Sequence, residues 1–188
     1  MVNSDLPAWS LRLISELDAA DRRAELVAKG LSPEQLNWKP RPDAWSVGQC
    51  LEHLRITNEV YLPAISRALE GRQPVKVQDV NLGWFSRWFI RNYIAPNPGG
   101  RRARAPKKSE PATEVQSLIL QAFLSSNEVA RRLVRRASDF DVNRIRFNNP
   151  FLPLLRFTVG TGLEIVAKHQ GRHLLQAEGV RCCSGFPQ

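Results

Sequence analysis

The sequence predicts an all-α protein built as a four-helix bundle with long crossover connections. Four long segments carry apolar residues at three- and four-residue steps, which is the spacing of one helix face. Signals for helix starts or stops flank these segments, and no stretch shows the sustained two-residue alternation of a strand. The length of 188 residues suits one domain, so we expect residues 1–188 to form a single bundle domain.

The first predicted helix spans residues 6–29 and stops at Gly30. Its apolar line consists of Leu13, Leu17, Ala20, Ala24 and Val27. Residues 32–35, Ser-Pro-Glu-Gln, combine a capping box with a proline at the first helical position, so they predict a short helical turn. Two prolines in residues 38–45 forbid a regular helix, and this segment is expected to be a loop.

The second long helix is predicted at residues 46–69. Ser46 and Gln49 have the spacing of a capping box and mark its start. Pro63 interrupts the apolar pattern and is expected to kink the helix. His53 lies beside the inward-facing apolar line of this helix.

The third and fourth long helices are predicted at residues 111–136 and 161–178. The fourth opens on a capping box formed by Thr161 and Glu164. Gly179 is expected to be its C-cap.

Two connecting segments have patterns of their own. Residues 81–95 predict a short helix with an aromatic side, within an aromatic and basic insertion at residues 80–110. This helix is expected to cover the bundle or a homodimer interface, and contact with a membrane surface is the alternative. Residues 148–157 are apolar but broken by prolines, and are expected to close one end of the bundle.

The charge balance favours anionic partners, since 27 Lys and Arg against 18 Asp and Glu give a net charge of +9. The arginine-rich run at residues 101–108 follows a Pro- and Gly-rich stretch and is expected in a loop. No nucleic-acid-binding motif accompanies the charge, so we do not expect a nucleic-acid partner. The chain shows no signal peptide and no apolar run of membrane-spanning length, which predicts a cytoplasmic protein.

The chain has three histidines, and two of them, His169 and His173, lie four residues apart on one predicted helix. Residues at this spacing share a face, so both rings can reach a common point. The pair alone also fits two core histidines satisfied by hydrogen bonds. His53 strengthens a metal-site interpretation because a bundle brings side chains of different helices together in its interior.

Two segments carry a family resemblance. "LNWKPRPDAWSVGQCLEHL" at residues 36–54, followed by "HQGRHLLQAEGV" at residues 169–180, resembles the DinB-like superfamily of DinB/YfiT-like metalloenzymes. The resemblance implies a four-helix bundle with a long crossover and identifies His53, His169 and His173 as the metal ligands. Three neutral imidazoles would hold zinc or nickel, with iron and manganese as further options, and would leave positions open for water or a thiolate.

The function implied by the resemblance is metal-dependent hydrolysis of a small molecule, or S-transfer that uses a low-molecular-weight thiol as cofactor. The reacting group would be water or a thiolate on the metal, and the residues identify no general base. Four side chains are candidates to surround the ligands or line a pocket: Trp45, Gln49, Cys50 and Thr57. Burial as a structural thiol is the favoured interpretation of Cys50. The alternative function is a non-enzymatic stress-response or binding module that applies its basic and aromatic surface to acidic lipid or nucleic acid.

Overall fold

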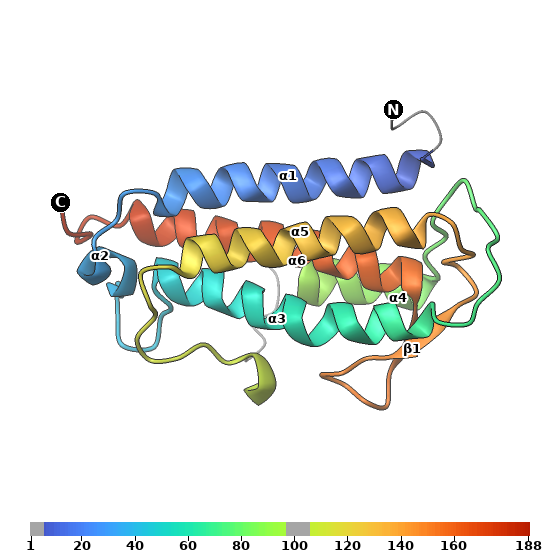
Figure 1. Ribbon diagram of the computed structural model, residues 1–188. Helices are drawn as coiled ribbons and strands as arrows, with labels where there is room; N and C mark the ends of the chain where they lie inside the picture. Colours follow the sequence, from blue (N-terminus) through green and yellow to red (C-terminus); the bar gives the residue numbers. More distant parts are fainter. Residues whose placement is uncertain (1–5, 97–105) are drawn as a thin grey trace.

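Four long helices lie side by side in the computed structural model, which describes residues 6–96 and 106–188 (Figure 1). They are α1 (Ala8–Ala28), α3 (Val47–Ala68), α5 (Ile119–Ala137) and α6 (Val159–Arg181). The predicted all-α bundle is therefore confirmed. Most of the predicted basic run, residues 101–105, lies outside the described residues.

The order of the helices requires a long crossover, as predicted. α1 and α3 each pack against both α5 and α6, so α1 and α3 lie diagonally across the bundle. Figure 1 shows that α3 and α5 run in the same direction, although they follow one another in the chain. The connection between them therefore has to return along the whole bundle.

The capping signals before two helices are confirmed. Ser32 caps the short helix α2 (Pro33–Asn37) and Ser46 caps α3, each through a complete capping box. Gly30, with φ of 80°, ends α1 in the left-handed conformation that glycine adopts without a steric penalty. α3 continues through Pro63 as one uninterrupted helix.

The prediction of a helix from residue 111 was wrong, because α5 begins only at Ile119. Side chains from other elements hold the preceding backbone in a non-helical path. Asn37 accepts a hydrogen bond from the Val115 amide and donates one to the Val115 carbonyl, at 2.8 and 3.0 Å. Gln49 Nε2 donates to the Ala112 carbonyl at 2.8 Å. These contacts replace the hydrogen bonds of a helical first turn.

Both predicted ends of the fourth helix also need correction. α6 begins at Val159, and its N-cap is Thr158, whose hydroxyl accepts from the Thr161 amide. The Glu164 carboxylate instead forms an ion pair with Arg12 on α1. Gly179 is not a C-cap, since α6 continues to Arg181.

Residues 148–157 belong to a small antiparallel hairpin. The sequence pattern predicted no strand here. β1 (Arg146–Asn148) pairs with β2 (Arg156–Thr158), with Phe147 opposite Phe157. Three residues are too few to show a two-residue period in the sequence. The two phenylalanines are buried, so the hairpin is held by the bundle core.

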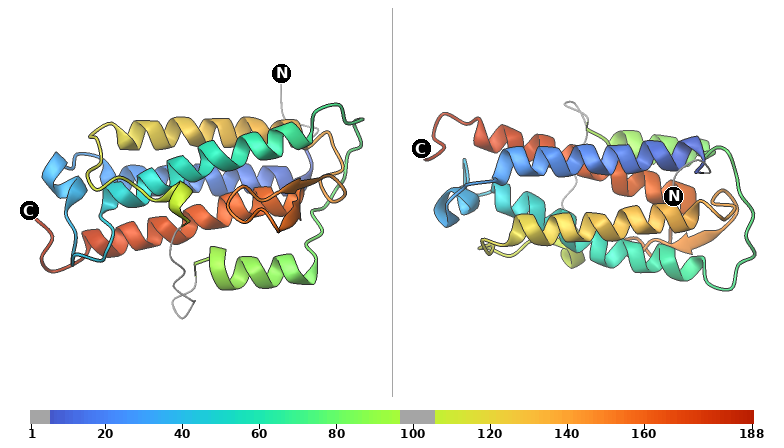
Figure 2. Two further views of the ribbon diagram at one scale, coloured as in Figure 1. Left: turned by 90° about the horizontal axis from the view of Figure 1, so that it is seen from below. Right: turned by 45° about the horizontal axis from the view of Figure 1, so that its top comes forward.

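The predicted aromatic helix is confirmed as α4 (Trp84–Phe89), which continues into the π-helical turn η1 (Ile90–Ile94). It lies outside the bundle next to α6 (Figure 2). The rings of Phe85 and Phe89 pack on Phe157, with centroids 6.3 and 5.3 Å away. The next described element in the chain is a 3₁₀ turn, η2 (Lys107–Ser109). No helix of the described residues is long and apolar enough to cross a membrane.

The bundle interior consists of two apolar clusters with polar side chains between them. One cluster contains Tyr61, Ile65 and Leu163, and the other contains Leu51, Phe123 and Leu174. The positions between these clusters along α3, α5 and α6 carry the histidines and a set of buried amides. The fold therefore places the histidines and these amides at mid-height.

Candidate metal centre

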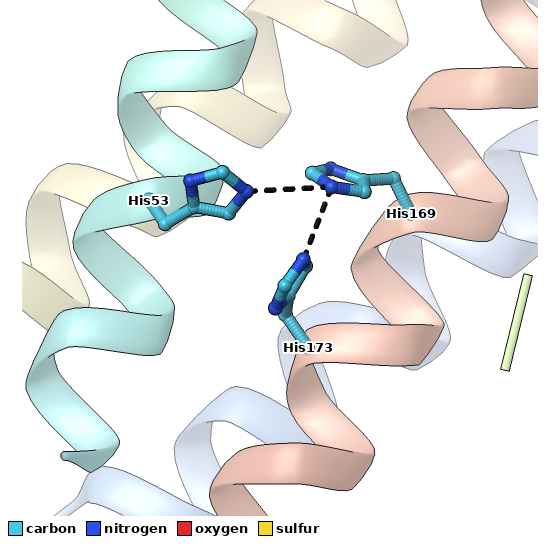
Figure 3. Close-up of side chains that lie close together, drawn as sticks. All are labelled: His53, His169 and His173. Atoms are coloured by element: carbon cyan, nitrogen blue, oxygen red, sulfur yellow. Dashed lines mark hydrogen bonds between the residues drawn. The ribbon is translucent and has the colours of Figure 1, made fainter. Parts of the chain in front are cut away.

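Three imidazole rings meet at the middle of the bundle (Figure 3). α3 supplies His53, and α6 supplies His169 and His173 one turn apart. His169 Nε2 lies 3.4 Å from His53 Nε2 and 3.1 Å from His173 Nε2. One ring nitrogen from each residue falls within 4.8 Å of the others, so the three could hold one ion.

The other ring nitrogen is used to orient two of the rings. His53 Nδ1 donates to the Ser109 carbonyl at 2.6 Å, and His173 Nδ1 donates to Gln176 Oε1 at 3.1 Å. A neutral imidazole that donates from Nδ1 carries its lone pair on Nε2, toward the common point. Gln176 could have been recognised from its position three residues after His173 on the same helix, whereas no local pattern pointed to Ser109.

The environment keeps all three rings neutral. Burial lowers the pKa of His53 and lowers the pKa of His173 to about 3. The pKa of His169 is lowered well below its ordinary value, first by burial and then by the positive charge that His173, His53 and Arg172 would place beside it. Neutral imidazole is the protonation state that binds a metal.

This donor set fits a divalent cation. Two neutral rings with Nδ1 protonated turn Nε2 lone pairs toward His169 Nε2, which has at most one proton to share. At least one contact therefore places two lone pairs face to face, and a cation removes that repulsion. A tetrahedral ion about 2.05 Å from each nitrogen would hold the nitrogens roughly 3.3 Å apart. This matches the 3.4 and 3.1 Å separations from His169 Nε2, whereas the three atoms span up to 4.8 Å and would draw together around an ion.

The structure brings two of the four predicted surrounding side chains to the histidines. The Trp45 ring covers the site, with centroids 4.8 Å from His53 and 5.5 Å from His173. Thr57 follows His53 by one helical turn, and its buried hydroxyl is without a hydrogen-bond partner in the described structure.

The other two candidates have structural roles. Gln49 uses its side chain on the Ser46 amide and the Ala112 carbonyl, so it holds the crossover and is not directed at the rings. Cys50 is fully buried in the apolar cluster around Leu51, and this burial raises the pKa of its thiol. The favoured interpretation of Cys50 as an inert thiol is consistent with this position.

Two acidic residues close to the histidines in sequence point elsewhere. Glu52 accepts a hydrogen bond from the Ala112 amide at 2.7 Å, and Glu164 pairs with Arg12. Among the described residues, the cluster of side chains close enough to share one ion contains the three histidines and no carboxylate.

A layer of buried amides lies directly behind the histidines and links all four helices. Asn127 of α5 exchanges hydrogen bonds with Gln170 of α6 at 2.6 and 3.0 Å. It also accepts from Asn58 of α3 at 3.0 Å and donates to Asp21 of α1 at 2.6 Å. Because Gln170 is adjacent to His169, this layer sets the rotation of α6 at the site.

An open cleft of about 1520 Å³ gives access to the three rings. Its walls come from the loop at residues 40–45, from α3 and α6, from the aromatic helix α4, and from the hairpin turn. The class of protein defined by these features is a helical bundle with an accessible, neutral three-histidine centre.

Comparison with known proteins identifies the family of this chain. Residues 16–177 match the DinB superfamily, and the chain belongs to that family. A relative in Bacillus subtilis (strain 168), the uncharacterized protein YuaE, is 23% identical over 163 residues, which cover 81% of this chain and 87% of YuaE.

Two solved structures share the fold. One is YfiT from Bacillus subtilis, described as a probable metal-dependent hydrolase with an unusual four-helix bundle topology. It has a TM-score of 0.61 and 13% identity, and the match covers 100% of this chain and 94% of YfiT. The other is the colibactin self-resistance protein ClbS in complex with a dsDNA, with a TM-score of 0.54, 14% identity, and coverage of 93% and 96%.

Proposed function

We propose that the protein is a metal-dependent hydrolase of a small molecule, with His53, His169 and His173 as the ligands of a divalent ion. The observation that carries this proposal is the convergence of three neutral Nε2 atoms at the floor of an open cleft. The description of YfiT as a probable metal-dependent hydrolase supports the same reaction class.

When bound, a divalent ion supplies Lewis acidity and lowers the pKa of a water or thiol that it holds. The chain's own residues prepare the site for this chemistry. Ser109 and Gln176 fix the direction of two rings, and Trp45 excludes water from one side. Thr57 lines the same cleft, and its buried hydroxyl has no hydrogen-bond partner within the described structure.

Thiol S-transfer is a second candidate for the same centre. A cleft of about 1520 Å³ exceeds the roughly 300–1,000 Å³ of an ordinary small-molecule pocket, so it has room for a thiol cofactor beside a substrate. Three neutral ligands also leave the full charge of the ion available to a thiolate.

The non-enzymatic alternative draws support from the outer surface of α4. Trp84 is 80% exposed, and Arg87 and Arg91 lie close to it. Binding to acidic lipid through this surface would be salt-sensitive and independent of the histidines.

Metal analysis tests the proposal. Protein purified without a histidine tag is expected to contain about one divalent ion per chain, and His173→Ala is expected to lose it with an unchanged helical circular dichroism spectrum. Metal-loaded wild-type protein is then screened for ester hydrolysis and for thiol transfer.

Lys168→Ala is the matched control on α6, because Lys168 pairs with Glu16 on α1 and does not line the cleft. It should keep the metal. Equal metal content in wild type and His173→Ala would contradict the proposed centre.

A further inference from the structure

The cleft above the histidines is divided by charge. Its charged lining side chains, among the described residues, are Arg41, Asp43, Glu110 and Arg172. All four lie in segments next to the imidazoles: Arg41 and Asp43 belong to the Trp45 loop, Glu110 follows Ser109, and Arg172 adjoins His173. Two positive and two negative side chains give this end no net charge.

The part of the cleft on the Tyr61 side of the histidines is an uncharged arm. α3 contributes its floor up to Tyr61, eight residues beyond His53, which corresponds to about 12 Å along the helix. The apolar and aromatic side chains of the arm are Tyr61, Phe85, Trp88, Phe89, Tyr93, Ile94, Phe151, Leu152, Leu155, Ile165 and Val166.

The walls of this arm are tied to the bundle at both ends. At the end of the arm away from the histidines, α4 contacts α6 through Ser86 and Thr161, whose hydroxyls lie 3.3 Å apart. Beyond η1, the Ala95 carbonyl accepts from Arg172 at 3.4 Å. Hydrogen bonds within the chain therefore hold the wall of the arm, which lowers the ordering cost of binding a ligand.

A polar atom without a partner marks the junction of the two regions. The Thr57 side chain is 7% exposed, and its Oγ1 makes no hydrogen bond within the described structure. A buried hydroxyl is normally paired, so an unpaired one beside a cleft indicates a group supplied by a ligand. Thr57 lies one turn from His53, between the charged end and the arm.

We propose that the substrate is an amphiphile, whose elongated apolar part lies in the arm and whose polar, reacting group meets the histidines and Thr57. Only the assignment of the reacting end rests on the proposed metal-dependent function. The apolar arm itself acts through burial, which needs no metal.

Binding of neutral probes tests the arm separately from the metal. Nile red is bound to the full-length protein and displaced by butanol, hexanol and octanol, with and without divalent metal. Each added methylene should strengthen displacement by up to roughly fourfold, the value for complete burial of a CH₂ group. The same trend should persist in the His173→Ala variant.

Matched pairs of variants locate the probe. Trp88→Ala and Leu152→Ser remove side chains that line the arm and should weaken octanol binding about tenfold. Trp84→Ala and Leu154→Ser change neighbours that are 80% and 98% exposed and do not line it, and should change binding less than twofold.

The outcomes separate this inference from the proposed function. If displacement depends on chain length but the protein binds no metal, the apolar arm is supported and the proposed hydrolase function is contradicted. A metal-loaded enzyme that hydrolyses nitrophenyl acetate and nitrophenyl octanoate equally well, with no dependence of displacement on chain length, would overturn the arm. Loss of a dimer in Trp88→Ala, with no displacement by octanol, would assign the aromatic face to a second copy of the chain and also overturn it.

Discussion

At the scale of single residues, the site depends on how each ring is held. The three rings are mutually adjacent, and the His169 Nε2 is the atom that the Nε2 atoms of both other rings approach. Ser109 and Gln176 decide that His53 and His173 present lone pairs there, so two ordinary hydrogen bonds determine the chemical character of the centre.

The Thr57→Val variant tests whether the unpaired hydroxyl has a functional role. Valine keeps the shape and removes a buried hydroxyl without a partner, so we expect the free energy of unfolding to rise by about 1 kcal/mol. Loss of a hydrogen bond to the substrate should lower kcat/KM about tenfold or more. Urea unfolding and steady-state kinetics measure the two effects.

Thr161→Val is its control. Thr161 is as deeply buried, but its hydroxyl bonds with Thr158 and Ser86, so the same substitution should destabilise the protein. A Thr57→Val variant that is less stable than wild type and equally active would contradict the functional role.

At the scale of elements, α6 combines the site with the tightest packing in the bundle. A β-carbon on Gly162 would lie 2.7 Å from the Phe147 ring and 2.9 Å from Ile65, whereas one on Gly179 would meet nothing within 4 Å. The first glycine lets the hairpin and α3 approach the helix, and the second leaves open space.

The two glycines predict opposite effects of alanine. Gly162→Ala should cost about 1–3 kcal/mol of unfolding free energy through overpacking against Phe147. Gly179→Ala should stabilise by about 0.5–1 kcal/mol, since alanine loses less backbone freedom in a helix. Urea unfolding of both variants checks the pair, and equal signs would contradict the packing of α6 described above.

Capping was the most informative local signal at this scale, but it also misled. Ser46 and Gln49 form the predicted box because the Gln49 oxygen stays on the Ser46 amide while its Nε2 bonds the Ala112 carbonyl. Thr161 and Glu164 have similar spacing, yet Glu164 pairs with Arg12 and Thr158 becomes the cap. Tertiary partners decided between the two local options.

At the scale of the whole molecule, three neutral histidines at mid-height make stability depend on pH. Their pKa values are lowered in the folded protein, so below about pH 6.5 the unfolded chain binds protons that the folded chain does not. Each histidine should therefore lower the free energy of unfolding by up to about 1.4 kcal/mol per pH unit as the pH falls from there toward its folded pKa.

Urea unfolding of the metal-free protein at about pH 7.5 and pH 5.5 measures this slope. His173→Ala removes one of the three groups, so the stability difference between wild type and the variant should shrink on acidification. A difference that is the same at both pH values would contradict a neutral, buried His173.

The sequence alone determined the local features of this protein. Helical periodicity and capping placed the four helices, and the 3.6-residue repeat put His169 and His173 on one face. These features depend on neighbours in the chain, so they can be recognised without knowledge of packing.

Only the tertiary structure decided how distant parts meet. It placed His53 against the α6 pair, the Ser109 carbonyl on His53, the Asn37 amide on the non-helical backbone at Val115, and the aromatic helix along the cleft. These approaches join residues far apart in sequence, and their energies come from the shared burial of whole helix faces, which no local pattern specifies.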